Sequence, residues 1–239
     1  MTSGHARLVE VPVLGSEPRG AYALVRLEGT SYRAPAPGRF AMAGEAGSST
    51  VPPRPVGLFT LRSGEVGMLV DPGYGGDLAR ASALQLLGPL GRGYDLTGLD
   101  AAGTLLVAGG IGLTVLVDVP GALGGRPRLL AGFRTAEQAE AARLVDADAT
   151  LVLAPATVTE PLESALAAGG VRAVLAAGPL GMMRAVAAAC AAHDVPCQVA
   201  LEARMACGFG ACYGCAVELD GTWQRLCIEG PVVDGRRLG

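Results

Sequence analysis

Residues 206–215 read ACGFGACYGC, and they place Cys207, Cys212 and Cys215 in one short loop that is followed by Cys227. The resulting spacing, C-x4-C-x2-C-x11-C, matches the plant-type pattern of [2Fe–2S] ligation. Such a cluster needs four thiolates that converge on two irons, and the glycines of the loop let its backbone curl and turn N–H groups towards sulfur. The spacing therefore predicts a [2Fe–2S] cluster held by these four cysteines.

A structural zinc site is the main alternative for the four cysteines. Zinc sites usually present two close pairs of ligands, whereas here three ligands crowd one loop and the fourth stands alone. The remaining cysteines, Cys190 and Cys197, lie outside the pattern, and we expect them to be small buried hydrophobic residues.

The cysteine loop belongs to a Cys- and Gly-rich tail, residues 198–239. This tail is too small to form a hydrophobic core alone and should need a bound metal to stabilise it. Before the tail, apolar runs at 104–108, 128–132, 150–154 and 173–177 alternate with Ala-rich segments of helical length. The clearest helix is expected at 182–192, where strong helix formers dominate. This alternation predicts a parallel sheet with helices on its faces.

Short β segments broken by Gly and Pro make up residues 1–97. Strands are expected at 7–13, 21–27, 39–43, 56–61, 65–70 and 83–87, with a polar loop at 44–52. Spacing of this kind favours a small antiparallel barrel. We therefore expect three domains, a β-barrel at 1–97, an α/β domain at 98–197 and a cluster domain at 198–239.

Composition narrows the class of protein. The chain has 239 residues, 19 basic against 22 acidic side chains, and a net charge of −3, which argues against nucleic-acid binding. No apolar core of a secretory signal is present near the N-terminus. The longest uncharged run, 101–117, is short and glycine-rich for a membrane span. We expect a cytoplasmic protein without membrane contact, and the presence of six cysteines in such a chain points to metal or redox chemistry before disulfides.

Two glycine turns in the α/β region are candidates for nucleotide binding. Gly109, Gly110 and Gly112 follow an apolar strand and precede a helical stretch, so that the backbone could approach a phosphate near a helix N-terminus. Gly178 and Pro179 form a second turn of the same kind, and ligands of open α/β sheets sit at the carboxyl ends of strands. Tight strand-to-helix turns remain the alternative for both.

The barrel region adds two weaker signals. Arg54 follows the polar loop and could pair with a pyrophosphate through two parallel hydrogen bonds. Residues 73–76, GYGG, precede an expected short helix at 77–82 and offer bare backbone amides to the same group. The alternatives are that Arg54 is an ordinary surface charge and that residues 73–76 form an ordinary turn.

Taken together, the order barrel, α/β sheet and cysteine tail resembles the electron transfer subunit of NAD-dependent dihydroorotate dehydrogenases, within the ferredoxin reductase-like flavoproteins. The resemblance is densest in ALEARMACGFGACYGCAVEL (200–219) and LCIEGPVVDG (226–235). Further matching segments lie at 37–40, 88–94, 109–112, 132–134 and 178–179.

The resemblance implies FAD in the barrel and a nicotinamide at the glycine turns. The implied FAD residues are Arg54, Pro55, Val56, Gly57, Leu69, Val70, Asp71, Gly75 and Gly76, and the nicotinamide residues are Gly109, Gly110, Gly112, Gly178 and Pro179. Gly57 stands where the flavin motif has Ser or Thr, and Gly76 where a Gly-Thr pair has Thr. On the nicotinamide side, Ala108, Val115 and Ala177 depart from the usual residues.

The implied activity is electron transfer in pyrimidine biosynthesis. Electrons would pass from an FMN-containing subunit that oxidises dihydroorotate, in a heterotetramer, through the [2Fe–2S] cluster and FAD to NAD. The cofactors carry this chemistry, so no residue needs to act as a catalytic acid, base or nucleophile. Two alternatives remain: a flavin and iron–sulfur reductase for another partner, and an accessory relay subunit that has lost nicotinamide binding.

Overall fold

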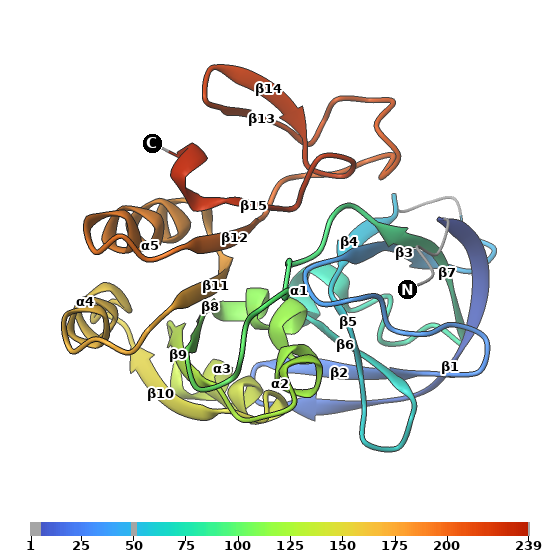
Figure 1. The fold of residues 1–239 in the computed structure, drawn as a ribbon. Coiled ribbons are helices and arrows are strands. Elements are labelled where there is room, and N and C mark those ends of the chain that lie inside the picture. Colours follow the sequence, from blue (N-terminus) through green and yellow to red (C-terminus); the bar gives the residue numbers. More distant parts are fainter. Residues whose placement is uncertain (1–5, 49–51, 239) are drawn as a thin grey trace.

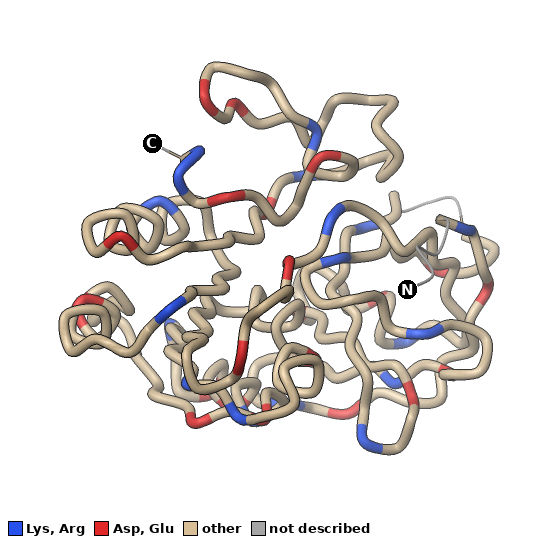
Figure 2. Tube along the Cα trace, in the orientation of Figure 1, with Lys and Arg blue, Asp and Glu red and all other residues tan. Residues whose placement is uncertain are grey.

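The computed structural model describes residues 6–48 and 52–238 (Figure 1). Within them, the strands form a seven-stranded sheet, a six-stranded sheet and a two-stranded hairpin. No helix of these segments has the length and apolar character needed to cross a bilayer. Acidic and basic side chains are interspersed along the trace (Figure 2).

The seven-stranded sheet is antiparallel and nearly closed into a barrel. Its strand order is β4-β3-β7-β1-β2-β6-β5, and the two end strands β4 and β5 are separated only by Gly57. Its interior is filled by buried apolar side chains of the kind represented by Val25, Met68 and Leu86, which confirms the predicted barrel. The strands are β1 (Arg7–Arg19), β2 (Tyr22–Leu27), β3 (Phe40–Glu45), β4 (Arg54–Val56), β5 (Leu58–Thr60), β6 (Val66–Val70) and β7 (Ala83–Leu90).

Several barrel boundaries differ from the sequence expectation. The strand expected at 56–61 is two strands, because the chain leaves β3, where Val56 pairs with Ala41, and joins β6, where Leu58 pairs with Met68. The first strand runs beyond residue 13, since an irregularity after Val13 lets it continue along β2. Of the loop expected at 44–52, residues 44 and 45 belong to β3, and 49–51 lie outside the described residues.

The helix expected at 77–82 is absent, and α1 (Pro72–Gly75) forms instead, one turn earlier. Its start is fixed by Asp71, whose carboxylate accepts from the Gly73 N–H at 2.8 Å, and by proline in the first turn. Residues 77–80 form turns, and a bend follows at residue 82. The glycines of 73–76 are therefore in and at the end of the helix rather than ahead of it.

The six-stranded sheet confirms the predicted α/β architecture. Its order is β10-β9-β8-β11-β12-β15, parallel except for β15, with β8 and β11 adjacent. The chain moves outward in opposite directions from this central pair, which makes it the switch point where open α/β sheets bind ligands. The strands are β8 (Thr104–Gly109), β9 (Arg128–Phe133), β10 (Asp148–Leu153), β11 (Ala173–Gly178), β12 (Cys197–Leu201) and β15 (Val232–Asp234).

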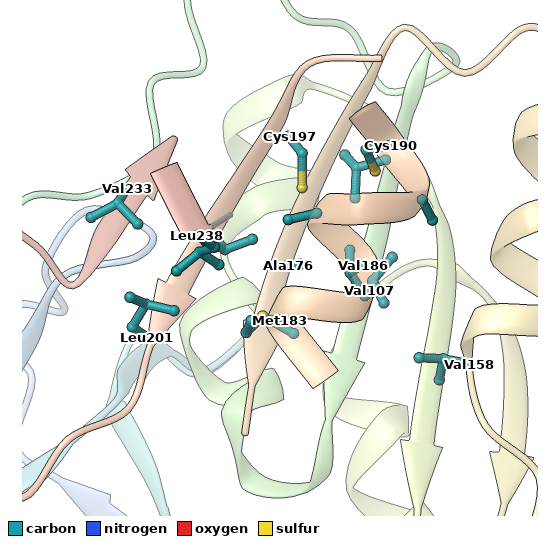
Figure 3. Close-up of a cluster of buried hydrophobic side chains, with 14 of the residues drawn as sticks. Val107, Val158, Ala176, Met183, Val186, Cys190, Cys197, Leu201, Val233 and Leu238 are labelled. Carbon is teal, nitrogen blue, oxygen red and sulfur yellow. The ribbon is translucent and has the colours of Figure 1, made fainter. Parts of the chain in front are cut away.

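Helices cover both faces of this sheet. One face carries the longest helix, α5, which packs Met183, Val186 and Cys190 against strand residues such as Val107 and Ala176 (Figure 3). The expected helix at 182–192 thus begins two residues earlier, and the strand expected at 150–154 is shifted to 148–153. The helical elements are η1 (Gly110–Leu116), α2 (Val119–Leu123), α3 (Ala136–Ala139), η2 (Glu140–Leu144), α4 (Thr159–Ala167) and α5 (Leu180–Ala192).

Cys190 and Cys197 are both buried in this core, in agreement with their expected role (Figure 3). The hydrogen bond between the two thiols, followed by burial, raises the pKa of Cys197. The same hydrogen bond lowers the pKa of Cys190, against the opposing effect of burial. Both side chains are thus packed in the hydrophobic core, and their exclusion from the ligand set stays a prediction.

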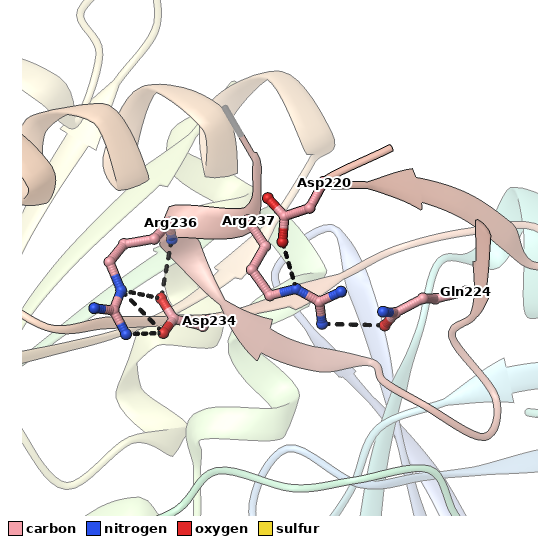
Figure 4. A network of polar contacts seen from close by, with 5 residues as sticks. All are labelled: Asp220, Gln224, Asp234, Arg236 and Arg237. Atoms are coloured by element: carbon pink, nitrogen blue, oxygen red, sulfur yellow. Dashed lines mark hydrogen bonds and ion pairs between the residues drawn. The ribbon is translucent and has the colours of Figure 1, made fainter. Parts of the chain in front are cut away.

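The tail returns to the sheet after a small hairpin, β13 (Ala216–Leu219) and β14 (Thr222–Arg225). Strand β15 pairs with β12, and η3 (Gly235–Leu238) packs on α5. Arg237 of η3 donates to Asp220 and Gln224 of the hairpin, and this ties the chain end to the cysteine region (Figure 4). The expected boundary at residue 198 falls inside β12, and the three domain ranges remain predictions.

Candidate cofactor sites

A cavity of about 510 Å³ lies where the barrel, the switch point of the α/β sheet and the segment leading to the cysteine loop meet. Many of the residues expected to bind FAD or nicotinamide line it, and four of them, Gly76, Gly109, Gly110 and Pro179, do not. Those that line it are Arg54, Pro55, Val56, Gly57, Leu69, Val70, Asp71, Gly75, Gly112 and Gly178.

Arg54 is the buried cation of this cavity. It extends from β4, and its two terminal nitrogens donate to the carboxylate of Asp77 while Nη1 also donates to the Tyr74 carbonyl at 2.7 Å. The hydrogen bonds from Arg54 lower the pKa of Asp77. The Nε–H of Arg54 is buried without a partner among the described residues. An unsatisfied charged donor at the wall of a cavity fits an anionic ligand such as a pyrophosphate.

The helix α1 lies tightly against the barrel next to Arg54. A Cβ on Gly75 would lie 3.0 Å from the Cβ of Val70, and one on Gly76 would lie 2.5 Å from the carbonyl oxygen of Pro72. Glycine at 75 therefore lets the backbone of α1 approach β6 at the edge of the cavity, whereas glycine at 76 leaves room for the Pro72 carbonyl within the same turn. This arrangement fits a bulky ligand that is bound through backbone groups.

The two glycine turns pack against one another at the switch point. A Cβ on Gly112 would lie 2.9 Å from the Gly178 nitrogen, and one on Gly178 would lie 3.1 Å from the Cα of Gly109. A Cβ on Gly109 would also lie 2.5 Å from the sulfur of Met182. Close packing accounts for these glycines as tight turns, while Gly112 and Gly178 also face the cavity.

Glu202 and Thr114 line the cavity but were not among the expected site residues. Glu202 directly follows β12, so the rule that ligands sit at strand carboxyl ends could have identified it. Desolvation by the surrounding protein raises the pKa of Glu202. Thr114 lies five residues after Gly109 in η1, and its buried hydroxyl carries no sequence signal of its own.

The cysteine loop is shaped by positive-φ residues. Gly208, Gly210 and Tyr213 have φ values of 74°, 84° and 58°. The turns bring the Cys212 N–H within 3.4 Å of the Cys207 sulfur, a backbone hydrogen bond that lowers the pKa of Cys207 to about 6. The loop therefore favours thiolate at its first cysteine.

The four expected ligands interact in two pairs. Cys207 and Cys212 form the outer pair, while Cys215 and Cys227 are buried and form the inner pair. Burial, followed by the neighbouring Cys215 thiol, raises the pKa of Cys227 to about 12. No three Cys, His, Asp or Glu side chains of the described residues are grouped as around a single metal ion. Together the two pairs supply the four thiolates that a [2Fe–2S] cluster needs.

The cysteine loop is packed beside the cavity. Met205 lines the cavity, and Cys207 follows two residues later, a chain length of at most about 7 Å. A Cβ on Gly208 would overlap the side chain of Met42 in β3 and lie 3.0 Å from Leu90 of β7. The first cysteine of the loop is thus held against the barrel close to the cavity wall.

Arg225 braces the cysteine loop from the hairpin side. Its Nη1 donates to the Gly210 carbonyl at 3.1 Å, and its Nη2 donates to Glu229 at 2.7 Å. The guanidinium also lies 5.1 Å from the centroid of the Tyr213 ring. These contacts join the two segments that carry the four cysteines.

Comparison with known proteins places these features in context. A family model described as "Iron-sulfur cluster binding domain of dihydroorotate dehydrogenase B" matches residues 202–239. The dihydroorotate dehydrogenase B (NAD(+)) electron transfer subunit of Streptococcus pneumoniae serotype 4 is 31% identical over 173 residues, which cover 65% of this chain and 67% of that protein. The corresponding subunit of Enterococcus faecalis is 34% identical over 167 residues, 62% of this chain and 63% of that protein.

Another relative, from Desulforamulus reducens, is 31% identical, and the matched region spans 63% of its length. Among solved structures, an NADH-dependent reduced ferredoxin-NADP oxidoreductase matches 99% of this chain and 91% of its own, with a TM-score of 0.78 at 19% identity. A ferredoxin reductase of carbazole 1,9a-dioxygenase matches 82% of this chain and 68% of its own, with a TM-score of 0.65 at 17% identity. These structures confirm the ferredoxin reductase-like fold.

Proposed function

This chain belongs to the family of dihydroorotate dehydrogenase B electron transfer subunits, and from that premise we propose that it relays electrons between a [2Fe–2S] cluster, FAD and NAD. One observation carries the proposal. A single cavity is bordered by the barrel with Arg54, by the glycine turns of the sheet, and by the segment that ends in the first cysteine of the loop. Three cofactor sites would thus meet at one place.

FAD would bind in the cavity, where it would exchange single electrons with the cluster and electron pairs with the nicotinamide. Arg54 would orient the pyrophosphate through its unpaired Nε–H, and Gly75 and Gly76 would keep the backbone of α1 close to it. Strand residues Leu69, Val70 and Val56 give the cavity an apolar wall that would exclude water from the flavin ring.

Cys207, Cys212, Cys215 and Cys227 would hold the [2Fe–2S] cluster. Backbone N–H groups of the loop already reach sulfur, as Gly214 does to Cys212 at 3.4 Å, and such hydrogen bonds raise the stability of thiolate. The protein would therefore set the potential of the cluster through loop geometry and its distance from FAD through the packing on the barrel.

The partner would be an FMN-containing subunit that oxidises dihydroorotate, in a cytoplasmic heterotetramer. The cluster region exposes large apolar side chains that a partner could cover, with Phe209 and Tyr213 each 61% exposed and Trp223 67% exposed. Exposed apolar groups of this kind mark interaction sites. Their position next to the cysteines would bring the partner's electrons to the cluster first.

A second candidate is a relay subunit that does not use NAD. It is favoured by the packing of the glycine turns. The side chain of Met182 occupies the space beside Gly109, and the backbone of Gly178 occupies the space beside Gly112. The glycines then serve the fold, and the nicotinamide would have little backbone to bind.

Anaerobic absorption spectra of the purified chain, reconstituted with iron, sulfide and FAD, test the proposal. Flavin and cluster absorption that are both bleached by NADH support the complete relay. Bleaching by dithionite but not by NADH supports the relay without NAD. Stoichiometric zinc in place of iron, or cluster absorption without any flavin binding, contradicts the proposed function.

A further inference from the structure

Thr114 and Gly57 approach each other across the junction between the barrel and the α/β sheet. Gly57 joins β4 to β5, and Thr114 lies in η1, which follows β8. A Cβ on Gly57 would overlap the hydroxyl of Thr114 and lie 2.9 Å from its Cβ and 3.1 Å from Cγ1 of Val115. Only a residue without a side chain at 57 leaves room for Thr114 in this position.

The approach is part of a firm docking of η1 on the barrel. The Gly38 N–H donates to the Val115 carbonyl at 3.1 Å, and both the N–H and the hydroxyl of Thr60 donate to the Asp118 carboxylate. The segment that directly follows Thr114 is therefore fixed to the barrel at two points.

Both residues line the cavity in which the flavin is proposed to bind. Thr114 is 5% exposed and is one of three buried polar or charged residues in the described chain, with Arg54 and Thr104. Its hydroxyl donates to the Ile111 carbonyl at 3.0 Å, so its hydrogen is committed and its oxygen keeps free acceptor capacity. The cavity thus has a fixed hydroxyl acceptor at the place where residue 57 contributes no side chain.

We propose that Thr114 supplies the hydroxyl that contacts the flavin, from the α/β sheet rather than from the barrel, and that Gly57 is the residue that makes room for it. The inference rests on the proposed binding of FAD in this cavity. Because its hydrogen is already donated, Thr114 accepts from ligand N–H groups. Two-electron reduction adds an N–H to the flavin ring at N5 and, in the neutral form, a second at N1, so a hydroxyl that accepts from one of these groups favours the reduced form.

Thr114→Val removes the hydroxyl at nearly constant volume, and Thr114→Ser keeps it. Thr104→Val is the matched control, because Thr104 is also buried, its hydroxyl also donates to a backbone carbonyl, that of Asp100 at 2.7 Å, and it does not line the cavity. FAD affinity is measured by fluorescence quenching, and the flavin midpoint potential by redox titration.

We expect Thr114→Val to weaken FAD binding about fivefold, as for one neutral hydrogen bond, and to shift the midpoint potential to a more negative value. Thr114→Ser and Thr104→Val should keep both values of the unmodified protein. Unchanged affinity and potential in Thr114→Val, with FAD still bound, overturn the inference alone. Absence of FAD binding by the unmodified protein overturns the proposed function and the inference together.

An exchange variant tests the role of Gly57. Gly57→Ser alone should lower the melting temperature of the FAD-free protein, because the new side chain overlaps Thr114. Thr114→Ala would still leave a Cβ 2.9 Å away, so the exchange requires Gly57→Ser with Thr114→Gly. We expect this double variant to bind FAD more tightly than Thr114→Gly alone. A Gly57→Ser protein that melts and binds FAD like the unmodified protein overturns the close approach.

Discussion

Arg54 donates hydrogen bonds from both of its terminal nitrogens to the carboxylate of Asp77, at the wall of the cavity between the barrel and the α/β sheet. The side chain of Arg54 is 11% exposed and that of Asp77 is 29% exposed, so the pair is largely removed from water. The pair fixes the direction of the guanidinium, and the Nε–H stays buried without a partner among the described residues.

Replacing Asp77 with Asn should lower the free energy of unfolding by about 1–3 kcal/mol at pH 7, because a nearly buried guanidinium loses its charged partner. Urea unfolding of the FAD-free protein measures this change. Asp146→Asn is the control, since Asp146 and Arg126 form an ion pair with both side chains more than half exposed, where about 0–1 kcal/mol is expected. Equal losses in the two variants would contradict the importance of burial.

The same variant has a predictable pH dependence. Hydrogen bonds from Arg54 lower the pKa of Asp77 in the folded protein. A lowered pKa contributes stability above the ordinary aspartate value of about 3.9, and this contribution disappears as the pH falls through the folded pKa. The difference in unfolding free energy between the unmodified protein and Asp77→Asn should therefore be constant from pH 5 to 7 and shrink below about pH 4. A gap that stays constant at pH 3 would refute the assignment.

Arg54→Lys should weaken FAD binding by about tenfold or more, because a lysine ammonium cannot replace a guanidinium that bonds with Asp77, Tyr74 and a ligand at once. Fluorescence titration with FAD provides the measurement. Arg26→Lys is the matched control, since Arg26 pairs with Glu65 in the barrel without lining the cavity. Equal FAD affinity of Arg54→Lys and the unmodified protein would remove Arg54 from the site.

The architecture could be predicted because it rests on local patterns. Glycine-bounded β segments indicated the barrel, and strand–helix alternation indicated the parallel sheet. The pattern failed where a local start signal competed with it, as at 71–77, where Asp71 caps α1 ahead of the helix expected at 77–82. It also failed at Gly57, where one glycine lets the chain change its neighbouring strand.

The site was predictable only where residue spacing along the chain reflects the chemistry. The cysteine spacing identified four ligands that lie in two interacting pairs, and their binding of a cluster remains a prediction. Asp77 and Thr114 could not be recognised, because their roles depend on contacts across the fold with Arg54 and Gly57. Tertiary approach of this kind leaves no period or motif in the sequence.

Cys227→Ser should abolish the [2Fe–2S] absorption and lower the bound iron to background, because a two-iron cluster needs all four thiolates. Iron and sulfide analysis after anaerobic reconstitution provides the measurement. Cys190→Ala is the control, since Cys190 is a fully buried residue of α5 and lies outside the loop. A full complement of iron in Cys227→Ser, or loss of iron in a folded Cys190→Ala protein, would contradict the assigned ligand set.

Arg225→Gln should leave the cluster in place but make it easier to remove. Arg225 bonds with the Gly210 carbonyl and with Glu229, and so holds the loop of three cysteines to the segment of the fourth. Loss of about one net hydrogen bond corresponds to about fivefold faster release of iron to a chelator. The control is Arg236→Gln, because Arg236 is 81% exposed and pairs only with the nearby Asp234 among the described residues (Figure 4). Equal rates of iron release in both variants would show that the contacts of Arg225 do not help to retain the cluster.

Substitution of Gly112 separates the two interpretations of the glycine turns. A Cβ at 112 would lie 2.9 Å from the Gly178 nitrogen and 3.0 Å from the Ala177 carbonyl, and backbone of this kind cannot move aside. Gly112→Ala should therefore destabilise the nucleotide-free protein by about 1–3 kcal/mol. Gly121→Ala in α2 meets nothing within 4 Å and should instead stabilise it by about 0.5–1 kcal/mol.

Thermal unfolding without any nucleotide measures the packing contribution of Gly112 alone, and NADH titration of the same variant measures the ligand contribution. A Gly112→Ala protein that melts like the unmodified protein but binds NADH less tightly would show that the glycine serves the nucleotide. A lowered melting temperature shows that position 112 must lack a side chain for β8 and β11 to pair. The nearest atoms to the new Cβ belong to the backbone at the end of β11, which cannot move away.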